Sequence, residues 1–444
     1  MGKYFGTDGI RGEANKTLDA QRAFLLGRYL GYYYQKNGNG KIIIGKDTRL
    51  SSSMFESALA AGITSQGCNV YLLNYCPTPA IAYLVTHKDF DCGAMISASH
   101  NPYYDNGIKV FDNTGIKISS ELENEIEEYL DGKCDIEYKT HQDIGQIISY
   151  SQGLEVYLDW LESSYKLNLR GMKIVIDCAN GSASTTAYQL LSRFNAEIVV
   201  LNNDPNGINI NEGCGSTHPE CLQKATIDNK ADIGFAFDGD ADRLIACDNM
   251  GNLVTGDHIL YVCSKYKKAN NTLVDNTLVT TVMANLGLFK ALEKEDIKTT
   301  VTAVGDKYVY ESMNENGFVL GGEQSGHIIF SDKLSTGDGL LSALELLLVM
   351  NSTNKKMSEL VDGLLIFPQL LINVKVSDKN EVMNLEELKE VIADVNNKLG
   401  DNGRLLVRPS GTEPIVRVMV EAENEELCSL YANEVVSVIM NSQS

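Results

Sequence analysis

The sequence lacks several features that mark other classes of protein. Its ten cysteines are scattered singly, without a CxxC pair, so we expect reduced, mostly buried thiols rather than disulfides or zinc ligands. No apolar run approaches the roughly 18 residues that a membrane helix requires. The first residues, MGKYFGTDGIRGE, do not combine a basic segment with an apolar core, as a secretory signal does. We therefore expect a cytoplasmic protein without a membrane partner.

Positive charge is scarce as well. Lys and Arg number 38 against 59 Asp and Glu, which gives a formal net charge of -21. Such a chain repels nucleic acid and anionic membrane surfaces at long range, so no nucleic-acid partner is expected. Any small anionic substrate must be held by a local cluster of basic side chains.

The length and the apolar pattern predict a multidomain α/β protein. A chain of 444 residues exceeds what one hydrophobic core usually supports and suggests three or four domains. Short apolar runs at 41–45, 69–73 and 92–97 predict strands, with helices near 19–35 and 52–66 between them. This alternation is typical of an α/β fold. Similar runs recur twice further along, which indicates three related α/β units.

After Phe367 and Pro368 the pattern changes to that of a smaller α+β domain. Its last helix could be capped by Asn424. Earlier in the chain, Ser120 and Glu123 form a capping box ahead of a helix that ends near Leu130. We expect four domains, at 1–150, 151–254, 255–366 and 367–444.

The stretch ISASHNP, residues 96–102, places Ser99 and His100 on a turn directly after an apolar run. One interpretation is a nucleophilic hydroxyl exposed on a stiff turn with a histidine beside it. The other is a strand that ends in ordinary turn residues, because Ser, Asn and Pro all favour turns. These seven residues alone leave both open.

FAFDGDADR, residues 235–243, carries Asp238, Asp240 and Asp242 at alternate positions beyond a predicted strand. In an extended conformation the three carboxylates point the same way and repel each other unless a cation lies among them. An EF-hand loop is excluded, because its sixth and twelfth positions hold Arg243 and Asn249 instead of Gly and Glu. A Mg²⁺ ion shared with a substrate phosphate fits this pattern, and a solvated acidic turn is the alternative.

Two further segments carry ligand-binding chemistry. RPSGTEPIVR, residues 408–417, lies between two predicted strands and offers guanidinium, hydroxyl and backbone N–H donors to an anion; the alternative is a turn with two surface ion pairs. GGEQSGH, residues 321–327, offers donors and acceptors suited to sugar hydroxyl or amino groups, or is only a polar β-turn. Near the N-terminus, Arg11 in FGTDGIRG could also reach an anion.

Together these segments closely resemble the α-D-phosphohexomutase superfamily. SASHNP, DGDADR, GEQSGH and RPSGTEP occur in the family's order, one in each expected domain, and the resemblance spans nearly the whole chain. KYFGTDGIRG and Gln324 look like the bacterial phosphoglucosamine mutase branch. The resemblance implies four domains around a central cleft, three of them related α/β domains and the fourth a smaller C-terminal α+β domain.

The resemblance also implies a reaction. Glucosamine 6-phosphate and glucosamine 1-phosphate would interconvert through a phosphorylated Ser99 and a bisphosphorylated sugar, on the route to UDP-N-acetylglucosamine. Glucosamine 1,6-bisphosphate or a similar sugar bisphosphate would serve as primer, and the chain could form a homodimer. One Mg²⁺ would be held by Ser99, through its phosphate, and by Asp238, Asp240 and Asp242. The sugar would meet Glu323, Ser325, His327 and Arg243, and its non-reacting phosphate would be held by Arg408, Ser410, Gly411, Thr412 and Arg417.

Attack by a sugar hydroxyl needs a group that handles its proton. Lys109 is the first candidate for general acid or base, because burial or a nearby cation can bring a lysine pKa towards neutrality; it could instead contact phosphate. His100 and His327 are further candidates, with His100 more suited to orienting the serine loop. Arg11 and Arg243 are charge partners for the transferring group or members of structural ion pairs.

One departure from the resemblance is visible, because Lys307 stands where arginine is expected in many relatives. Lysine keeps the charge but loses the bidentate fork, so a phosphate contact at this position is doubtful. Three other functions stay open: phosphomannomutase or phosphoglucomutase, a Mg²⁺-dependent sugar phosphatase, and a non-catalytic phosphosugar-binding protein.

Overall fold

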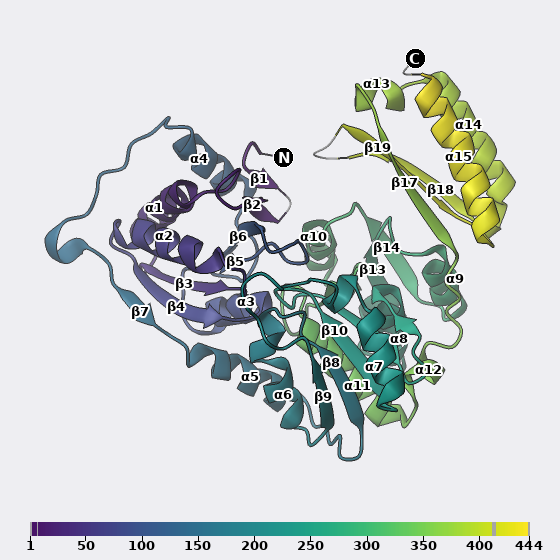
Figure 1. The fold of residues 1–444 in the computed structure, drawn as a ribbon, viewed down its shortest axis with the longest axis horizontal. Helices are drawn as coiled ribbons and strands as arrows, with labels where there is room; N and C mark the ends of the chain where they lie inside the picture. The colour runs from purple at the N-terminus through teal and green to yellow at the C-terminus, as the bar shows by residue number, and fades with distance from the viewer. Residues whose placement is uncertain (1, 7, 411–413, 443–444) are drawn as a thin grey trace. The chain divides into compact units, whose positions relative to one another are not determined.

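The computed structural model describes residues 2–6, 8–410 and 414–442. Two compact units make up the chain (Figure 1). The larger unit comprises residues 1–283 and 297–362, and the smaller unit comprises residues 284–296 and 363–444. The larger unit contains three sheets and the smaller unit contains one.

The first sheet has the strand order β1-β2-β6-β5-β3-β4-β7. Its centre is parallel, since β3 pairs in parallel with both β4 and β5, whereas β6 runs antiparallel to β5. Such a centre is buried on both faces and reads as continuous apolar runs, as in the fully buried CGAMI of β5. The strands are β1 (Phe5–Gly6), β2 (Gly9–Glu13), β3 (Lys41–Lys46), β4 (Asn69–Tyr75), β5 (Cys92–Ile96), β6 (Asp105–Asp112) and β7 (Ile147–Ser149), and the helices are α1 (Ala20–Asn37), α2 (Ser52–Thr64), α3 (Thr78–His87) and α4 (Ser120–Leu130).

The second sheet has the order β12-β11-β10-β8-β9. Strands β9, β8 and β10 are parallel, and β11 turns back antiparallel to β10, so the segment DGDADR lies in the short connection at the end of these two strands. The strands are β8 (Lys173–Asp177), β9 (Glu197–Leu201), β10 (Ile233–Phe237), β11 (Leu244–Asp248) and β12 (Leu253–Val254), and the helices are α5 (Gly153–Ser163), α6 (Ala187–Ser192) and α7 (Glu220–Asp228).

The third sheet has the order β14-β13-β15-β16. Strands β15 and β16 form an antiparallel pair whose connection carries the segment GEQSGH. The strands are β13 (Thr277–Thr281), β14 (Lys298–Thr302), β15 (Leu320–Gly322) and β16 (Ile328–Phe330), and the helices are α8 (Gly256–Ala269), α10 (Asp306–Asn316), α11 (Gly339–Thr353) and α12 (Met357–Leu360).

The smaller unit is an antiparallel sheet covered by helices. Its order is β17-β19-β18, and α14 and α15 lie side by side over it (Figure 1). Val416, Val418 and Val420 alternate along β19 and enter the core, as expected for a sheet with one buried face. The elements are α9 (Leu286–Lys294), β17 (Gln369–Lys375), α13 (Lys379–Met383), α14 (Glu386–Leu399), β18 (Arg404–Pro409), β19 (Ile415–Glu421) and α15 (Glu425–Asn441).

Of the two helix caps predicted from the sequence, one is present in the structure and the other is not. Asn424 caps α15, accepting the Leu427 N–H at 2.9 Å, as predicted. The capping box at Ser120 is wrong, because Ser119 is the N-cap of α4 and its hydroxyl accepts the Leu122 N–H. Ser119 has the extended backbone that an N-cap needs, whereas Ser120 is already helical.

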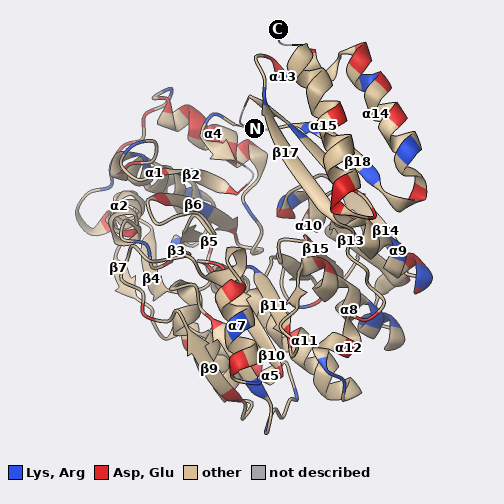
Figure 2. Ribbon diagram, turned by 45° about the vertical axis from the view of Figure 1, so that its right-hand side comes forward, with Lys and Arg blue, Asp and Glu red and all other residues tan. Residues whose placement is uncertain are grey.

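The distribution of charged residues and the state of the cysteines agree with what the composition predicts. Figure 2 shows acidic residues gathered along α4, while α14 carries residues of both signs of charge. All ten cysteines are free thiols, and eight of them are buried. None of the described helices is both long enough and apolar enough to cross a membrane.

Candidate active site

Ser99 lies just beyond the end of β5, buried to 1% exposure, with its hydroxyl directed at the acidic loop of the second sheet. Its Oγ donates to Asp238 Oδ2 at 2.6 Å and lies 3.3 Å from His100 Nδ1. The Ser99 backbone is left-handed, with φ of 54°, a conformation that a residue with a Cβ adopts only at a cost. Its own N–H donates to Ser97 Oγ at 2.8 Å, which helps to hold that conformation.

The three aspartates converge, but they do so on a tight turn with a left-handed Ala241 and not on the extended segment that the alternating pattern predicted. Asp238, Asp240 and Asp242 are buried, and one carboxylate oxygen from each lies within 4.8 Å of the others. Asp240 Oδ1 and Asp242 Oδ1 have no hydrogen-bond partner. Gly239 allows this loop to approach Ser99, because a Cβ at position 239 would lie 2.5 Å from the Ser99 carbonyl oxygen.

The electrostatics of this cluster suit a divalent cation. Burial, together with the charges of Asp242 and Asp240, raises the pKa of Asp238 well above its ordinary value. Burial acts the same way on Asp240, but Lys109 and Thr78 outweigh it and lower the pKa of that carboxyl to about 2. Buried carboxylate oxygens without partners, next to a hydroxyl oxygen, are the hard ligands that Mg²⁺ prefers. The residues present therefore fit the predicted metal site.

Lys109 projects from β6 into the same cluster. Its Nζ lies 2.8 Å from Asp240 Oδ2, 2.9 Å from Asp242 Oδ2 and 3.2 Å from Asp8 Oδ2. Burial alone would lower the pKa of Lys109, but these three carboxylates outweigh it and raise that pKa well above its ordinary value. The direction is opposite to the shift that the sequence argument for a general base invoked.

His100 Nδ1 lies near both the Ser99 hydroxyl and the Arg243 guanidinium. Arg243 donates from its guanidinium to His100 Nδ1 at 3.1 Å, and its main-chain N–H donates to Asp238 Oδ1 at 3.2 Å. Burial, with the charges of Arg243 and Arg11, lowers the pKa of His100 to about 4, so this imidazole is neutral at pH 7. Arg11 pairs with Asp8, and the Nε atoms of Arg11 and Arg243 are buried without a partner.

The GEQSGH turn is tied to the acidic loop. The N–H of Leu244, directly after that loop, donates to the Gly326 carbonyl at 3.0 Å. Glu323 Oε1 accepts the N–H of Gly305 at 3.0 Å. His327 is buried with its Nε2 3.9 Å from Asp242 Oδ2, and its Nδ1 has no partner. His327 thus reaches the aspartate cluster from the third sheet, whereas Glu323 contacts Gly305, and Ser325 lies in the turn between them.

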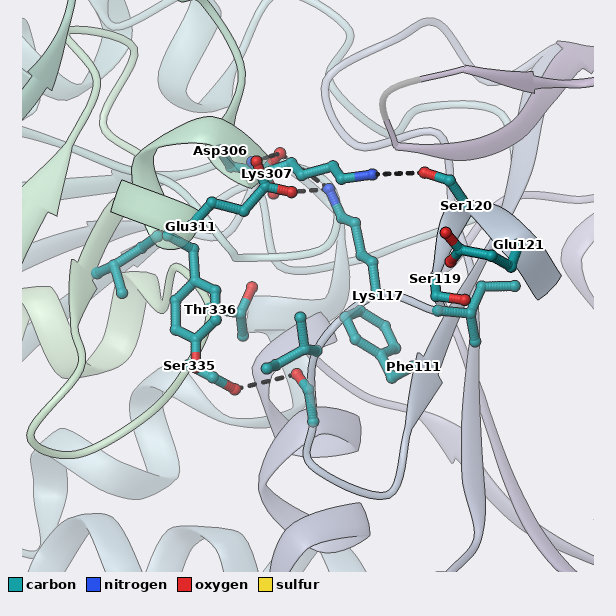
Figure 3. A pocket seen from close by; sticks show the side chains of 15 residues that line it. Phe111, Lys117, Ser119, Ser120, Glu121, Asp306, Lys307, Glu311, Ser335 and Thr336 are labelled. Carbon is teal, nitrogen blue, oxygen red and sulfur yellow. Dashed lines mark hydrogen bonds and ion pairs between the residues drawn. The ribbon is translucent and has the colours of Figure 1, made fainter. Parts of the chain in front are cut away.

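An ionic bridge that the sequence argument missed links the first and third sheets. Lys117 Nζ lies 2.7 Å from Asp8 Oδ1 and 2.7 Å from Asp306 Oδ2 (Figure 3). Nearby, Lys307 Nζ donates to Ser120 Oγ at 3.2 Å. Lys117, Asp306, Lys307 and Ser120 are among the residues that line a cavity of about 280 Å³. Nothing in the sequence pairs Lys117 with Asp306, because 188 intervening residues separate them and each stands alone among ordinary turn and helix residues.

The predicted phosphate-binding segment lies in the smaller unit. Arg408 and Arg417 face each other in register on β18 and β19. Burial, together with the charge of Arg417, lowers the pKa of Arg408, as expected for two like charges held together. Ser410 closes the turn by donating its N–H to the Ile415 carbonyl at 2.9 Å. Gly411 and Thr412 lie outside the described residues.

Comparison with known proteins identifies the family. Models of the phosphoglucomutase/phosphomannomutase family match successive parts of the chain: α/β/α domain I at residues 2–135, domain II at 155–251, domain III at 255–366 and the C-terminal domain at 371–438. The chain belongs to this family. The resemblance drawn from the four motifs is confirmed, as is the fold class of three α/β domains and a smaller C-terminal domain.

Individual members of the phosphoglucomutase/phosphomannomutase family are also similar. A relative from Lachnoclostridium phytofermentans, named phosphoglucosamine mutase, is 50% identical over 440 residues, covering 99% of this chain and 98% of the relative. Two solved structures share the fold. A phosphoglucomutase/phosphomannomutase family protein from Burkholderia thailandensis has a TM-score of 0.82 at 24% identity, covering 98% of this chain and 97% of the other. Aspergillus fumigatus N-acetylphosphoglucosamine mutase, solved with GlcNAc-6P and magnesium, has a TM-score of 0.74 at 17% identity, covering 99% and 96%.

Proposed function

We propose that this chain catalyses the phosphoglucosamine mutase reaction, the interconversion of glucosamine 6-phosphate and glucosamine 1-phosphate. The observation that carries the proposal is the hydrogen bond of 2.6 Å from Ser99 Oγ to Asp238, at the edge of a buried aspartate cluster. A hydroxyl in that place is suited to carry a phosphoryl group beside a cation. The 50% identical relative named phosphoglucosamine mutase favours glucosamine as the sugar.

The reaction requires two successive phosphoryl transfers, each of a different phosphoryl group. In the first, the bond between Ser99 Oγ and phosphorus breaks and a bond forms between phosphorus and the free sugar hydroxyl oxygen; that hydroxyl loses a proton and the released Ser99 Oγ gains one. The bisphosphorylated sugar then turns over, and its other phosphate passes to Ser99 by the reverse of the same chemistry. Phosphoryl transfer depends on in-line positioning and on neutralising charge more than on covalent help.

Each side chain near Ser99 has a part in that requirement. A bound Mg²⁺, one ion held by Asp238, Asp240, Asp242 and a Ser99 phosphate oxygen, would neutralise charge on the transferring group. Arg243 and Arg11 bring half-buried guanidinium groups to the same place, each with an Nε atom that has no hydrogen-bond partner. Protonated Lys109 can donate a proton or a hydrogen bond but cannot accept a proton, which favours an acid or charge-neutralising role. Neutral His100 orients the serine loop through its contact with Arg243.

The two remaining loops divide recognition between them. Glu323, Ser325 and His327 would contact the sugar ring. The facing guanidinium groups of Arg408 and Arg417 suit a phosphate, whose charge would relieve their repulsion. With Ser410, Gly411 and Thr412, they would grip whichever phosphate is not reacting. A sugar bisphosphate such as glucosamine 1,6-bisphosphate would prime Ser99.

The setting of the enzyme is a proposal as well. Ten free cysteines favour a reducing compartment such as the cytoplasm. A homodimer and the four domain boundaries at 1–150, 151–254, 255–366 and 367–444 stay predictions that rest on the resemblance and on the sequence pattern.

The decisive experiment replaces Ser99→Ala and compares it with Ser57→Ala, an exposed hydroxyl on α2. Ser99→Ala should abolish turnover and should no longer retain radiolabel from a sugar bisphosphate, whereas Ser57→Ala should behave as the unmodified chain does. Undiminished labelling of Ser99→Ala would overturn the assignment. In the same assay, a higher kcat/KM on mannose or glucose phosphates would shift the proposal to another sugar, and steady release of inorganic phosphate would indicate a phosphatase.

A further inference from the structure

A buried arginine holds the main chain around Ser99. Arg49 follows β3, and its side chain is completely buried. One terminal nitrogen of its guanidinium donates to the carbonyls of Ser99 at 2.8 Å and Asn101 at 2.9 Å, and the other donates to the carbonyl of Pro102. A single planar group thus satisfies three carbonyl oxygens of the loop that carries the hydroxyl.

Arg49 is itself fixed by Asp47. Its Nε donates to Asp47 Oδ2 at 2.8 Å, and its main-chain N–H donates to Asp47 Oδ1 at 3.0 Å. The other contacts of Asp47 anchor the pair to the first sheet, because Ser52 Oγ donates to Asp47 Oδ1 and the Asp47 N–H donates to the carbonyl of Ile96 at the end of β5. The guanidinium therefore has little freedom to follow the loop if the loop moves.

A second donor reaches two of the same carbonyls from the second sheet. Asn211 lies in the loop between β9 and α7, buried to 8% exposure, and its Nδ2 donates to the carbonyls of Ser99 at 2.9 Å and Asn101 at 3.1 Å. The main-chain N–H of Asn211 donates to the Ala179 carbonyl at 2.9 Å, close to the end of β8. The Ser99 carbonyl is thus clamped between the sheet that carries the nucleophile and the sheet that carries the aspartates.

The clamp matters because the serine loop is strained and because its carbonyls are buried. A left-handed Ser99 persists only where the surroundings hold it, and a buried carbonyl without a donor is costly. Turning the Ser99 peptide away from Arg49 and Asn211 would leave that carbonyl without these donors and would move Oγ away from Asp238. We propose that Arg49 and Asn211 are positioning residues that fix the line of phosphoryl transfer from Ser99. This inference rests on the proposed role of Ser99 in the mutase reaction.

The test compares two variants by the rate at which phosphorylated, radiolabelled enzyme transfers its phosphate to the sugar phosphate. Arg49→Lys keeps the charge beside Asp47 but loses the fork that spans three carbonyls. Asn211→Gly removes the amide donor and tolerates the left-handed φ of 59° at that position. Each should slow single-turnover transfer from phosphorylated Ser99 to the sugar phosphate by about 10- to 100-fold, as a small misplacement does. The KM for the sugar phosphate should stay within about twofold, because neither residue reaches the proposed sugar or phosphate loops.

Matched controls separate positioning from general loss of packing. Arg28→Lys makes the same change at another buried arginine that donates to a main-chain carbonyl, that of Ile136, and Asn195→Gly makes the same change at an exposed left-handed asparagine. Both controls should transfer phosphate at the unmodified rate. Arg49 and Asn211 donate to the same two carbonyls, so their effects should not be independent. The fold-loss of transfer rate in the double variant should therefore be smaller than the product of the two single fold-losses.

The outcomes are distinguishable. Three results would overturn the positioning role while leaving the mutase reaction intact. They are transfer at the unmodified rate by both Arg49→Lys and Asn211→Gly, an equal loss of rate in the Arg28→Lys control, and a rise in KM without a loss of rate. If Arg49→Lys fails to fold, Asn211→Gly alone decides between these results. If the unmodified chain never carries label on Ser99, the proposed function itself fails, whatever the variants do.

Discussion

The aspartate cluster of the larger unit and the arginine pair of the smaller unit arrange their charges in opposite ways. Around Ser99, charges of both signs alternate: Lys109 lies between Asp8, Asp240 and Asp242, and Arg11 pairs with Asp8. On β18 and β19, Arg408 and Arg417 face each other with like charge. The first region pairs opposite charges within the protein, whereas the second holds two like charges next to each other.

The difference assigns different work to the two regions. A network of paired opposite charges can hold reacting atoms in fixed positions with little reorganisation, which suits the chemical step. A pair of like charges is relieved when a phosphate binds, which suits binding but does little for the reaction. In a chain of net charge -21, we expect such a cationic pair to provide a local attraction for an anionic substrate.

The largest effect is expected from removing the cation of the aspartate cluster. Chelation of Mg²⁺, or Asp240→Asn, should lower turnover by about 1,000-fold or more, since the ion contributes several kcal/mol of charge stabilisation. Asp228→Asn, at an exposed position of α7, is the matched control. Adding Mg²⁺ at about 100 times its Kd should stabilise the unmodified chain by about 2.7 kcal/mol. Stabilisation of Asp240→Asn to the same extent would show that the ion binds elsewhere.

A smaller effect, on binding, is expected in the smaller unit. Arg417→Ala should raise KM by about 10- to 100-fold, since a charge-assisted hydrogen bond contributes about 1.5–3 kcal/mol. The rise should be similar for glucosamine 6-phosphate and glucosamine 1-phosphate, because either end of the sugar would use the same anion site. Steady-state kinetics in both directions measure it.

Arg404 offers the matched control for Arg417. It lies on the same small sheet, but its Nε already donates to the buried carboxylate of Glu421 at 2.8 Å. Arg404→Ala should therefore lower stability, because it leaves that carboxylate buried without its cation, and should leave KM unchanged. A KM effect for only one of the two phosphosugars in Arg417→Ala would contradict a shared phosphate site.

What the sequence predicted depends on how far apart the interacting residues lie in the chain. The strands and the acidic loop follow from local patterns, since alternate aspartates after an apolar run need only a strand and a turn to converge. Thr78, whose hydroxyl and N–H both bond Asp240, had no such signal. Lys117 and Arg49 also had no local signal in the sequence. A lysine or arginine in a turn is usually solvated, and only the packing of segments that are distant in the chain buries these two side chains. The direction of the Lys109 pKa was missed for the same reason.

The bridge between Lys117 and Asp306 predicts a pH-dependent stability. Burial would raise the pKa of Asp306, but Lys117 outweighs it and lowers that pKa; burial would lower the pKa of Lys117, but Asp306 and Asp8 raise it. Asp306 therefore contributes to the free energy of unfolding at pH values above its ordinary pKa of 3.8. This contribution is lost as the pH falls through the lower pKa that Asp306 has in the folded protein. Lys117 contributes to the free energy of unfolding at pH values below its ordinary pKa of 10.5. This contribution is lost as the pH rises through the higher pKa that Lys117 has in the folded protein.

Lys117→Met should reduce the free energy of unfolding by about 2 kcal/mol at pH 7, since it leaves Asp306 and Asp8 without a shared cation. The loss should shrink as the pH approaches 4, where an Asp306 that lacks its cation becomes protonated. Urea unfolding at pH 4, 5.5 and 7 measures this. Lys173→Met, which removes an exposed pair with Glu197, should cost almost nothing at any of these pH values. Equal losses at pH 4 and pH 7 would show that the bridge contributes packing rather than charge.

The smallest effect is expected from Lys307→Arg, which restores the residue expected in many relatives. The Lys307 Nζ reaches Ser120 Oγ at 3.2 Å, at the rim of the cavity in Figure 3, and Asp306 next to it is already paired with Lys117. A half-buried lysine that donates to a neutral hydroxyl holds no charge network together, so the change should alter kcat/KM by less than about twofold. A gain of tenfold or more would mean that position 307 contacts a phosphate, because only a bidentate contact distinguishes the two side chains that strongly. The larger unit would then share anion binding with the arginine pair, and the division of work between the two regions would no longer hold.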